Sequence, residues 1–147
     1  MTTQIAACRL CAPRFAATAT AHVPRPVIWF RPGPRVLIAG QAPGMRVHRS
    51  GRPFDDLSGD RLRDGMGHSP EVFYDRDKIA IVPMAFCFPG HDAKGSDLPP
   101  PPLCAATWRA DVNAALGRPW VSRTWSCWWG HMPNAGIWVT GKASRRA

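Results

Sequence analysis

The sequence predicts an α/β fold, a three-layer α/β/α sandwich with a short parallel sheet, and two patterns lead to it. Two short apolar runs, residues 36–39 and 79–82, have the continuous hydrophobic character of strands that are buried on both faces. A loop and a helical pattern follow each run, and strand, loop and helix in repetition are typical of a parallel sheet covered by helices. The length of 147 residues suits a single domain.

The first strand follows a long lead-in. The segment HVPRPVIWFRPGP, residues 22–34, is rich in Pro and Gly and predicts an extended conformation. Residues 36–39 form the strand, and we expect a loop over residues 40–54. A helix follows in DDLSGDRLRDGMG, where we expect Leu57, Leu62 and Met66 near one face. Its start can be capped by one of three side chains, Asp55, Asp56 or Ser58.

The second half of the pattern repeats the first. The strand over residues 79–82 ends at Pro83, and a loop over residues 83–97 follows it. Four prolines then lead into the helical segment LCAATWRADVNAAL, with Pro102 at its first turn. Both loops come directly after strands, and ligands of open parallel sheets bind beyond the carboxyl ends of the strands. The two loops are therefore the place to look for a site.

The chain changes character at about residue 119. Five of its seven Trp lie in residues 119–147, which show neither a helical nor a strand period. We therefore divide the chain into a domain over residues 1–118 and a Trp-rich tail over residues 119–147 that is foreign to the fold. The string TWSCWWGHMP looks like GC-rich codons read out of frame, so we expect the C-terminal portion of the fold to be incomplete, either truncated or frameshifted.

The charge balance favours an anionic partner. Nineteen basic residues against 10 acidic ones give a net charge of +9, and all but three of the basic residues are Arg, whose planar fork suits phosphate. Nucleic acid is the usual partner of such a chain, and a solvated basic surface is the alternative. No apolar run approaches the ~20 residues that span a membrane, and the N-terminus lacks the pattern of a signal peptide. We expect a cytoplasmic protein with no membrane partner.

Four of the five cysteines form a pattern of their own. Cys8, Cys11, Cys87 and Cys104 are spaced C-x2-C-x75-C-x16-C. In a reducing compartment such residues are ligands or free thiols rather than disulfides. Four thiolates can hold a 4Fe–4S cluster or a tetrahedral Zn, and buried incidental thiols are the alternative reading. Cys127 lies in the tail and is left out of this set.

These motifs, in their order, resemble the uracil-DNA glycosylase superfamily. The resemblance is carried by the C-x2-C pair, a strand ending in GQAPG (residues 40–44), GRPF (residues 51–54), a cysteine after the next strand, and another some sixteen residues on. It covers roughly residues 5–116 and is greatest for the iron–sulfur branch, family 4. It implies a four-stranded parallel sheet between helices and an enzyme that flips uracil out of DNA and hydrolyses its N-glycosidic bond. We expect it to act as a monomer on DNA that contains uracil or another deaminated base.

The resemblance also implies a role for particular residues. Gly40, Gln41, Ala42, Pro43 and Gly44 match the motif that positions the attacking water and supplies backbone groups near the sugar. Phe54 matches the aromatic residue that stacks on the flipped base, and a core residue is the alternative reading. The four cysteines match the ligands of a 4Fe–4S cluster. Between the motifs lies a basic group that would meet the DNA backbone, with a solvated loop as the alternative: Arg46, His48, Arg49 and Arg52.

The chain departs from the family pattern at three places. The iron–sulfur branch typically has Glu at the position of Gln41, and Gln can orient a water but cannot take its proton. Family members usually present Asn near the position of Pro83, which has no side-chain donor. The C-terminal His-Pro-Ser-like motif is missing, and HMPN at residues 131–134 is the nearest string. These departures leave two further readings open: a non-catalytic relative that binds DNA lesions, and an unrelated small metal-binding protein with four cysteine ligands.

Overall fold

The computed structural model describes residues 1–117 and the backbone of residues 138–141. Its elements, in chain order, are α1 (Thr2–Ala6), α2 (Ala12–Ala16), β1 (Val36–Gly40), α3 (Met45–Ser50), α4 (Leu57–Met66), α5 (Pro70–Phe73), β2 (Ile79–Pro83), α6 (Pro102–Leu116) and β3 (Trp138–Gly141).

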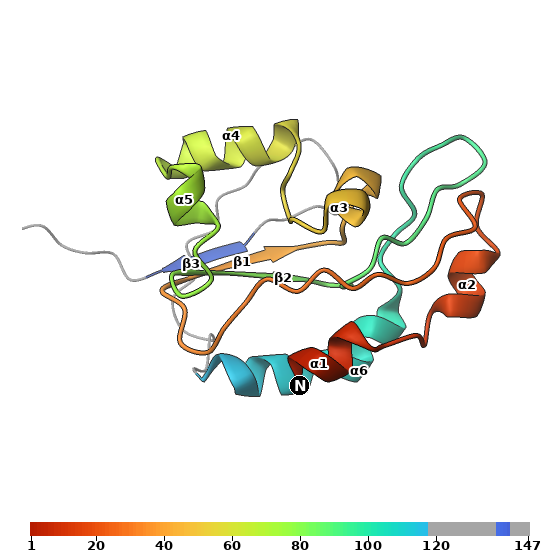
Figure 1. The fold of residues 1–147 in the computed structure, drawn as a ribbon, viewed down its shortest axis with the longest axis horizontal. Helices are drawn as coiled ribbons and strands as arrows, with labels where there is room; N and C mark the ends of the chain where they lie inside the picture. The colour runs from red at the N-terminus through yellow and green to blue at the C-terminus, as the bar shows by residue number, and fades with distance from the viewer. Residues whose placement is uncertain (118–137, 142–147) are drawn as a thin grey trace, which may run out of the picture.

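The helices lie on both faces of one sheet. Figure 1 shows α3, α4 and α5 on one side of the strands and α1 and α6 on the other. Strands β1 and β2 pair in parallel, from Val36 opposite Ile79 to Gly40 opposite Pro83. The predicted three-layer α/β/α sandwich with a short parallel sheet is confirmed, and both predicted strands are present and one residue longer than expected.

The third strand differs from what the resemblance implies. In the described part of the chain the sheet has the order β2-β1-β3, and β3 runs antiparallel to β1, whereas four parallel strands were implied. Strand β3 pairs the edge of β1 that β2 leaves open, so backbone groups that would otherwise lack partners are satisfied. It belongs to the segment over residues 119–147. The remainder of that segment, with Cys127 and residues 131–134, lies outside the described residues, so the division at residue 118 stays a prediction.

Each face of the sheet has its own hydrophobic core. Alternate residues of β2 point to opposite faces, as the period of a strand requires. The cluster between the sheet and the helices α4 and α5 consists of Ile38, Leu62, Phe73, Ile79 and Ile81. The cluster on the opposite face, under α1 and α6, consists of Ile5, Phe30, Ala80, Val82, Phe86, Val112 and Leu116. Burial on both faces explains why the strands read as continuous apolar runs.

Helix α4 lies within the segment that the sequence predicts, residues 55–67, but one of its three predicted core-facing residues is exposed. The carboxylate of Asp56 accepts a hydrogen bond of 2.9 Å from the backbone N–H of Gly59, which makes Asp56 the capping residue among the three candidates. Leu62 and Met66 face the core, but Leu57 is 73% exposed. The expectation for Leu57 is wrong because five residues of helix turn its side chain about 140° away from that of Leu62.

Four short helices were not anticipated, and α3 corrects the predicted loop over residues 40–54. The six residues of α3 are MRVHRS, which show no amphipathic repeat over so few positions. The helix ends at Gly51, whose φ of 73° is the left-handed conformation that suits glycine, and whose N–H bonds to Val47 O at 2.8 Å. Gly51 was the signal in the sequence from which the end of this helix could have been predicted. The others are α1, α2 and α5.

The predicted extended lead-in runs alongside β2. The backbone N–H of Ile81 donates to Trp29 O at 2.7 Å, and the N–H of Val27 donates to Phe86 O at 2.8 Å. These bonds bring Val27 and Trp29 to the sheet near the end of β2. No helix among the described residues has the length and hydropathy needed to cross a membrane.

Candidate functional site

A cavity of about 230 Å³ lies at the carboxyl ends of β1 and β2. Five of the residues that the sequence singled out line it: Gly40, Gln41, Ala42, Pro43 and Phe54. The remaining lining residues come from the lead-in, from GRPF and from β2: Val27, Trp29, Pro53, Ile81 and Pro83. The structure therefore brings the two sequence motifs together on one space, at the sheet edge where parallel sheets bind ligands.

Backbone hydrogen bonds join the loops that follow the two strands. Gly40 O accepts from the N–H of Met84 at 2.9 Å, and Gln41 O accepts from the N–H of Ala85 at 3.0 Å. The side chain of Gln41 is exposed, whereas Pro43 is buried. The start of the loop is thus fixed to the end of β2, so its position relative to the cavity does not depend on side chains alone.

Gly44 differs from its neighbours because it is not among the residues lining this cavity. It precedes the first residue of α3, and a Cβ built on it would lie 3.4 Å from Oδ2 of Asp97. Oδ1 of Asp97 is 3.0 Å from Nε2 of His91 in the same loop. Sequence reasoning missed this carboxylate beside the motif, and only the folding of the loop over residues 83–97 brings it there.

Phe54 closes one side of the cavity in an unusual backbone conformation. Its φ is 54°, in the left-handed region that side chains other than glycine rarely adopt. A Cβ built on Gly40 would lie 3.9 Å from the ring atom Cζ of Phe54, and the ring meets that of Phe73 edge-on with centroids 6.1 Å apart. Phe54 is half-buried, so it both packs on the core and faces the cavity.

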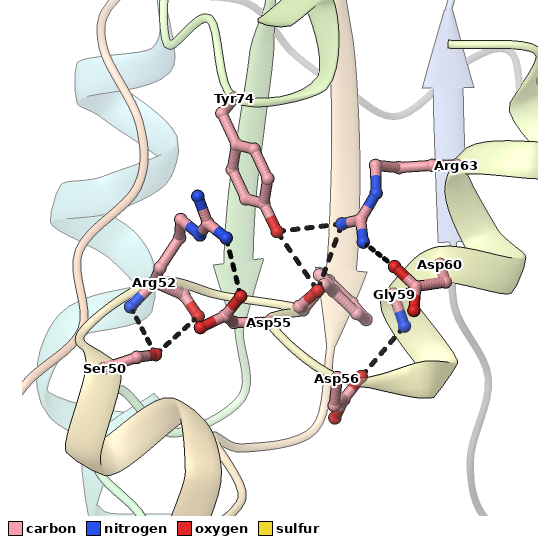
Figure 2. Close-up of polar contacts among 9 residues, drawn as sticks. Ser50, Arg52, Asp55, Asp56, Gly59, Asp60, Arg63 and Tyr74 are labelled. Carbon is pink, nitrogen blue, oxygen red and sulfur yellow. Dashed lines mark hydrogen bonds and ion pairs between the residues drawn. The ribbon is translucent and has the colours of Figure 1, made fainter. Parts of the chain in front are cut away.

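The basic residues near the cavity fall into two groups. Arg46 and Arg49 lie on α3 with exposed side chains, and no ion pair among residues 1–117 involves either of them. Arg52 instead donates to Oδ1 of Asp55 at 2.7 Å and stacks over the ring of Tyr74, 4.6 Å from its centroid. Figure 2 shows Arg52 turned toward Asp55. This hydrogen bond lowers the pKa of Asp55 and raises that of Arg52.

His48 points inward and does not join the exposed arginines, which corrects its expected place in the basic group. Its ring contacts those of His22 and Phe88, with centroids 5.1 Å and 5.8 Å away, and its buried Nδ1 has no hydrogen-bond partner among the described residues. Burial, and then the charges of His22, Arg25 and Arg49, lower the pKa of His48. A neutral, inward ring is a packing residue rather than a phosphate contact.

The four cysteines of the C-x2-C-x75-C-x16-C pattern line one further cavity. Cys8 and Cys11 reach it from the segment joining α1 and α2, Cys87 from the loop after β2, and Cys104 from the first turn of α6. All four are half-buried free thiols, and the other lining side chains are apolar. In the described part of the chain, no three or more His, Cys, Asp or Glu side chains are placed so that together they could hold one metal ion.

The thiols lie close enough to influence one another. The pKa of Cys87 is raised to about 12, first by burial and then by the negative charges of Cys104, Cys11 and Cys8 in that order. Burial is the largest cause that raises the pKa of Cys11, and the charge of Cys8 is the next. Burial is also the largest cause that raises the pKa of Cys104; a hydrogen bond from the backbone of Phe86 lowers that pKa, and the charges of Cys11 and Cys8 raise it further. With their pKa values raised, Cys11, Cys87 and Cys104 stay protonated unless a cation stabilises their thiolate forms. Four cysteine sulfurs are the donors that Zn and iron–sulfur clusters take, so the donor set fits a thiolate-bound metal or cluster.

One comparison with known proteins bears on this arrangement. The family model described as the uracil DNA glycosylase superfamily matches residues 27–142. The match begins in the extended lead-in, takes in the whole cavity at the ends of β1 and β2, and extends through β3. It includes Cys87 and Cys104 and begins after Cys8 and Cys11.

Proposed function

The chain belongs to the uracil DNA glycosylase superfamily, and from that premise we propose that it is a DNA-repair glycosylase acting on uracil or another deaminated base flipped out of DNA. The observation that carries the proposal is the shared cavity, where the loop from Gly40 to Pro43 faces Phe54. Membership of this family excludes the hypothesis that the chain is an unrelated metal-binding protein. We further propose that the chain acts as a monomer.

Phe54 is the proposed platform for the flipped base. Taking a base out of the stack costs a few kcal/mol, and stacking on an aromatic ring returns ~1–3 kcal/mol. Small and apolar groups line the cavity together with the ring, among them Ala42 and Ile81. A space of about 230 Å³ with such walls favours a flat, weakly polar ligand.

Gln41 is the proposed partner of the attacking water. In hydrolysis the water oxygen bonds to C1′ of the sugar, the base leaves with the electron pair of the broken bond, and a proton from the water passes to the departing base. The amide of Gln41 can orient that water but cannot take its proton. Glycosidic cleavage passes through an oxocarbenium-like state, so electrostatic stabilisation carries more of the reaction than a strong base.

Arg46 and Arg49 are the proposed contacts to the DNA backbone. Both extend from α3, which begins at Met45 directly after Gly44, so the charges lie a few residues along the chain from the loop that lines the cavity. Arg52 was expected to join them, but its guanidinium is held by Asp55 at 2.7 Å. We infer that Arg52 contributes less to phosphate binding than the two exposed arginines.

The iron–sulfur branch is the proposed place of this chain within the superfamily, with Cys8, Cys11, Cys87 and Cys104 as ligands of a 4Fe–4S cluster. The thiols line a cavity without converging on one point. A 4Fe–4S cluster takes one thiolate on each of its four irons, whereas Zn takes four ligands about 2.3 Å from a single ion. The resemblance to the iron–sulfur branch supports the cluster, and Zn is the alternative metal.

A non-catalytic relative that binds lesions is the second candidate, and two residues favour it. Gln41 occupies the place of a typical acid, and Pro83 forms part of the cavity wall without a side-chain donor to read the base. Such a protein would use Phe54 and the arginines for recognition and leave the glycosidic bond intact.

An incision assay separates the two candidates. Duplexes carrying one uracil, hypoxanthine or xanthine are incubated with the full chain and treated with alkali to cut at abasic sites. We expect strand scission for at least one base, and a loss of it in Phe54→Ala. Binding to lesion DNA without scission of any duplex would support the non-catalytic relative and exclude the glycosylase.

A further inference from the structure

Arg63 and Tyr74 converge on the backbone of the residue that faces the base cavity. We propose that they are positioning residues that hold Phe54 in the conformation in which its ring can stack on a base, an inference that rests on the proposed function. Neither residue lines the cavity, and neither belongs to the motifs that the sequence singled out.

The need for a clamp comes from the backbone of Phe54. A φ of 54° is unfavourable for a residue with a side chain, and it persists only where the surrounding structure imposes it. Were Phe54 to relax to a negative φ, its carbonyl group and its ring would both swing away from their present directions. The position of the ring is therefore tied to whatever holds the carbonyl.

Two donors hold that carbonyl oxygen. Nη1 of Arg63 and the hydroxyl of Tyr74 each donate to Phe54 O at 3.1 Å, and Nη1 of Arg63 also donates to the Tyr74 hydroxyl at 2.8 Å. Figure 2 shows the guanidinium of Arg63, from α4, and the ring of Tyr74, which follows α5, turned toward each other. The three groups form a closed triangle in which each donor supports the other.

Both donors are themselves fixed by packing and charge. The side chain of Arg63 is only 11% exposed and pairs with Asp60 one turn earlier on α4. Its guanidinium lies 5.3 Å from the ring centroid of Phe73. Tyr74 packs edge-on against Phe73 and against Trp29, which lines the base cavity. Burial raises the pKa of Tyr74, so its phenol keeps the proton that it donates.

The test measures selectivity for a flippable base rather than overall binding. The probe is a duplex with one 2′-fluoro-2′-deoxyuridine opposite guanine, whose glycosidic bond resists hydrolysis because fluorine disfavours the oxocarbenium state. The affinity of the protein for this duplex is compared with its affinity for the same duplex with cytosine in place of the modified uridine. Tyr74→Phe keeps the ring contacts and removes one donor, and Arg63→Lys keeps the charge beside Asp60 and removes the fork. Arg76→Lys is the matched control. It makes the same substitution at another arginine that stacks on an aromatic ring, with its guanidinium carbon 4.0 Å from the ring centroid of Trp29.

We expect Tyr74→Phe and Arg63→Lys each to lower the preference for the uracil duplex by about three- to tenfold, the size of one lost hydrogen bond. Neither should change affinity for the undamaged duplex, and Arg76→Lys should change neither quantity. In a Phe54→Ala background, Tyr74→Phe should have no further effect, because the clamp acts through the ring.

Three results overturn the inference. If Phe54→Ala reduces the preference but Tyr74→Phe and Arg63→Lys do not, the ring is functional and needs no clamp. If Tyr74→Phe has the same effect with and without the Phe54 ring, its role is general stability. If Phe54→Ala itself leaves the preference unchanged, the stacking role in the proposed function fails, and the positioning role fails with it.

Discussion

The ideal Cβ position of Gly59 lies 1.8 Å from the backbone carbonyl oxygen of Phe54. Real side chains never approach a carbonyl so closely, so only glycine lets the first turn of α4 pack against the backbone of Phe54. The same oxygen accepts the hydrogen bonds of Arg63 and Tyr74. Gly59 thus provides the space that the unusual conformation of Phe54 occupies.

Gly59→Ala should destabilise the protein by about 1–3 kcal/mol, because the new methyl group meets backbone that cannot move aside as a side chain would. The measurement is urea unfolding followed by circular dichroism. Gly65→Ala is the matched control in the same helix, since a Cβ there has nothing within 4 Å. Gly65→Ala should stabilise by about 0.5–1 kcal/mol through helix propensity. Equal effects of the two substitutions would contradict the packing argument.

Arg46→Ala and Arg49→Ala should each make DNA binding less dependent on salt. Each phosphate contact contributes roughly 0.9 to the slope of log K against log salt concentration, so each substitution should lower its magnitude by about 1. Binding is measured by fluorescence anisotropy over a range of salt concentrations.

Arg52→Ala should change that slope by less, since its charge is paired with Asp55. Arg31→Ala serves as control, because Arg31 is exposed and paired with Asp77 at 3.0 Å. A slope that falls equally in all four variants would mean that net charge, rather than α3, governs the interaction with DNA.

Cys87→Ser should abolish metal or cluster binding in anaerobically purified protein. Burial raises the pKa of Cys87 to about 12, and its thiol lies close enough to Cys8, Cys11 and Cys104 for their charges to act on it. A 4Fe–4S cluster gives a visible absorption band, whereas Zn gives none and is found by elemental analysis. Cys127→Ser is the control and should keep the wild-type metal content. Iron and zinc both absent from the wild-type protein would leave the four residues as structural thiols.

His48 should make the folded state less stable in mild acid. Because its pKa in the folded protein is lowered from 6.5, the unfolded chain binds more protons just below that pH. The contribution of the neutral His48 to the free energy of unfolding is therefore fully present above about pH 6.5, and it is lost as the pH drops toward the pKa of the folded state. The lowered pKa values of Asp55 and Asp75 act in a separate window, below their ordinary value of 3.8.

His48→Gln should flatten this dependence. The free energy of unfolding is measured in urea between about pH 5 and pH 7.5, a range that isolates histidine from the carboxylates. We expect the variant to lose less stability than the wild type over that range, whatever its stability at the upper end. An identical pH dependence in both proteins would show that His48 does not remain neutral in the fold.

The main elements could be predicted because each has a recognisable pattern within a few neighbouring residues. Strands β1 and β2 are continuous apolar runs, and α4 follows the capping carboxylate of Asp56. Helix α3 was missed because six residues carry too little pattern, and its ends depend on contacts such as the bond from Gly51 to Val47. The basic group was predicted only in part for a related reason. The segment predicted as a loop is the helix α3, in which His48 points inward.

The family and the fold class follow from the sequence alone, which also places the loop from Gly40 to Pro43 and the ring of Phe54 at one edge of the sheet. These are local signals that survive without knowledge of distant contacts. How Phe54 is held depends on contacts that form in the folded chain. The donors to its carbonyl come from residues 9 and 20 positions further along the chain, and Gly59 makes room for it from the next helix. A positive φ at a phenylalanine is unfavourable locally, so it exists only because these long-range contacts offset its cost.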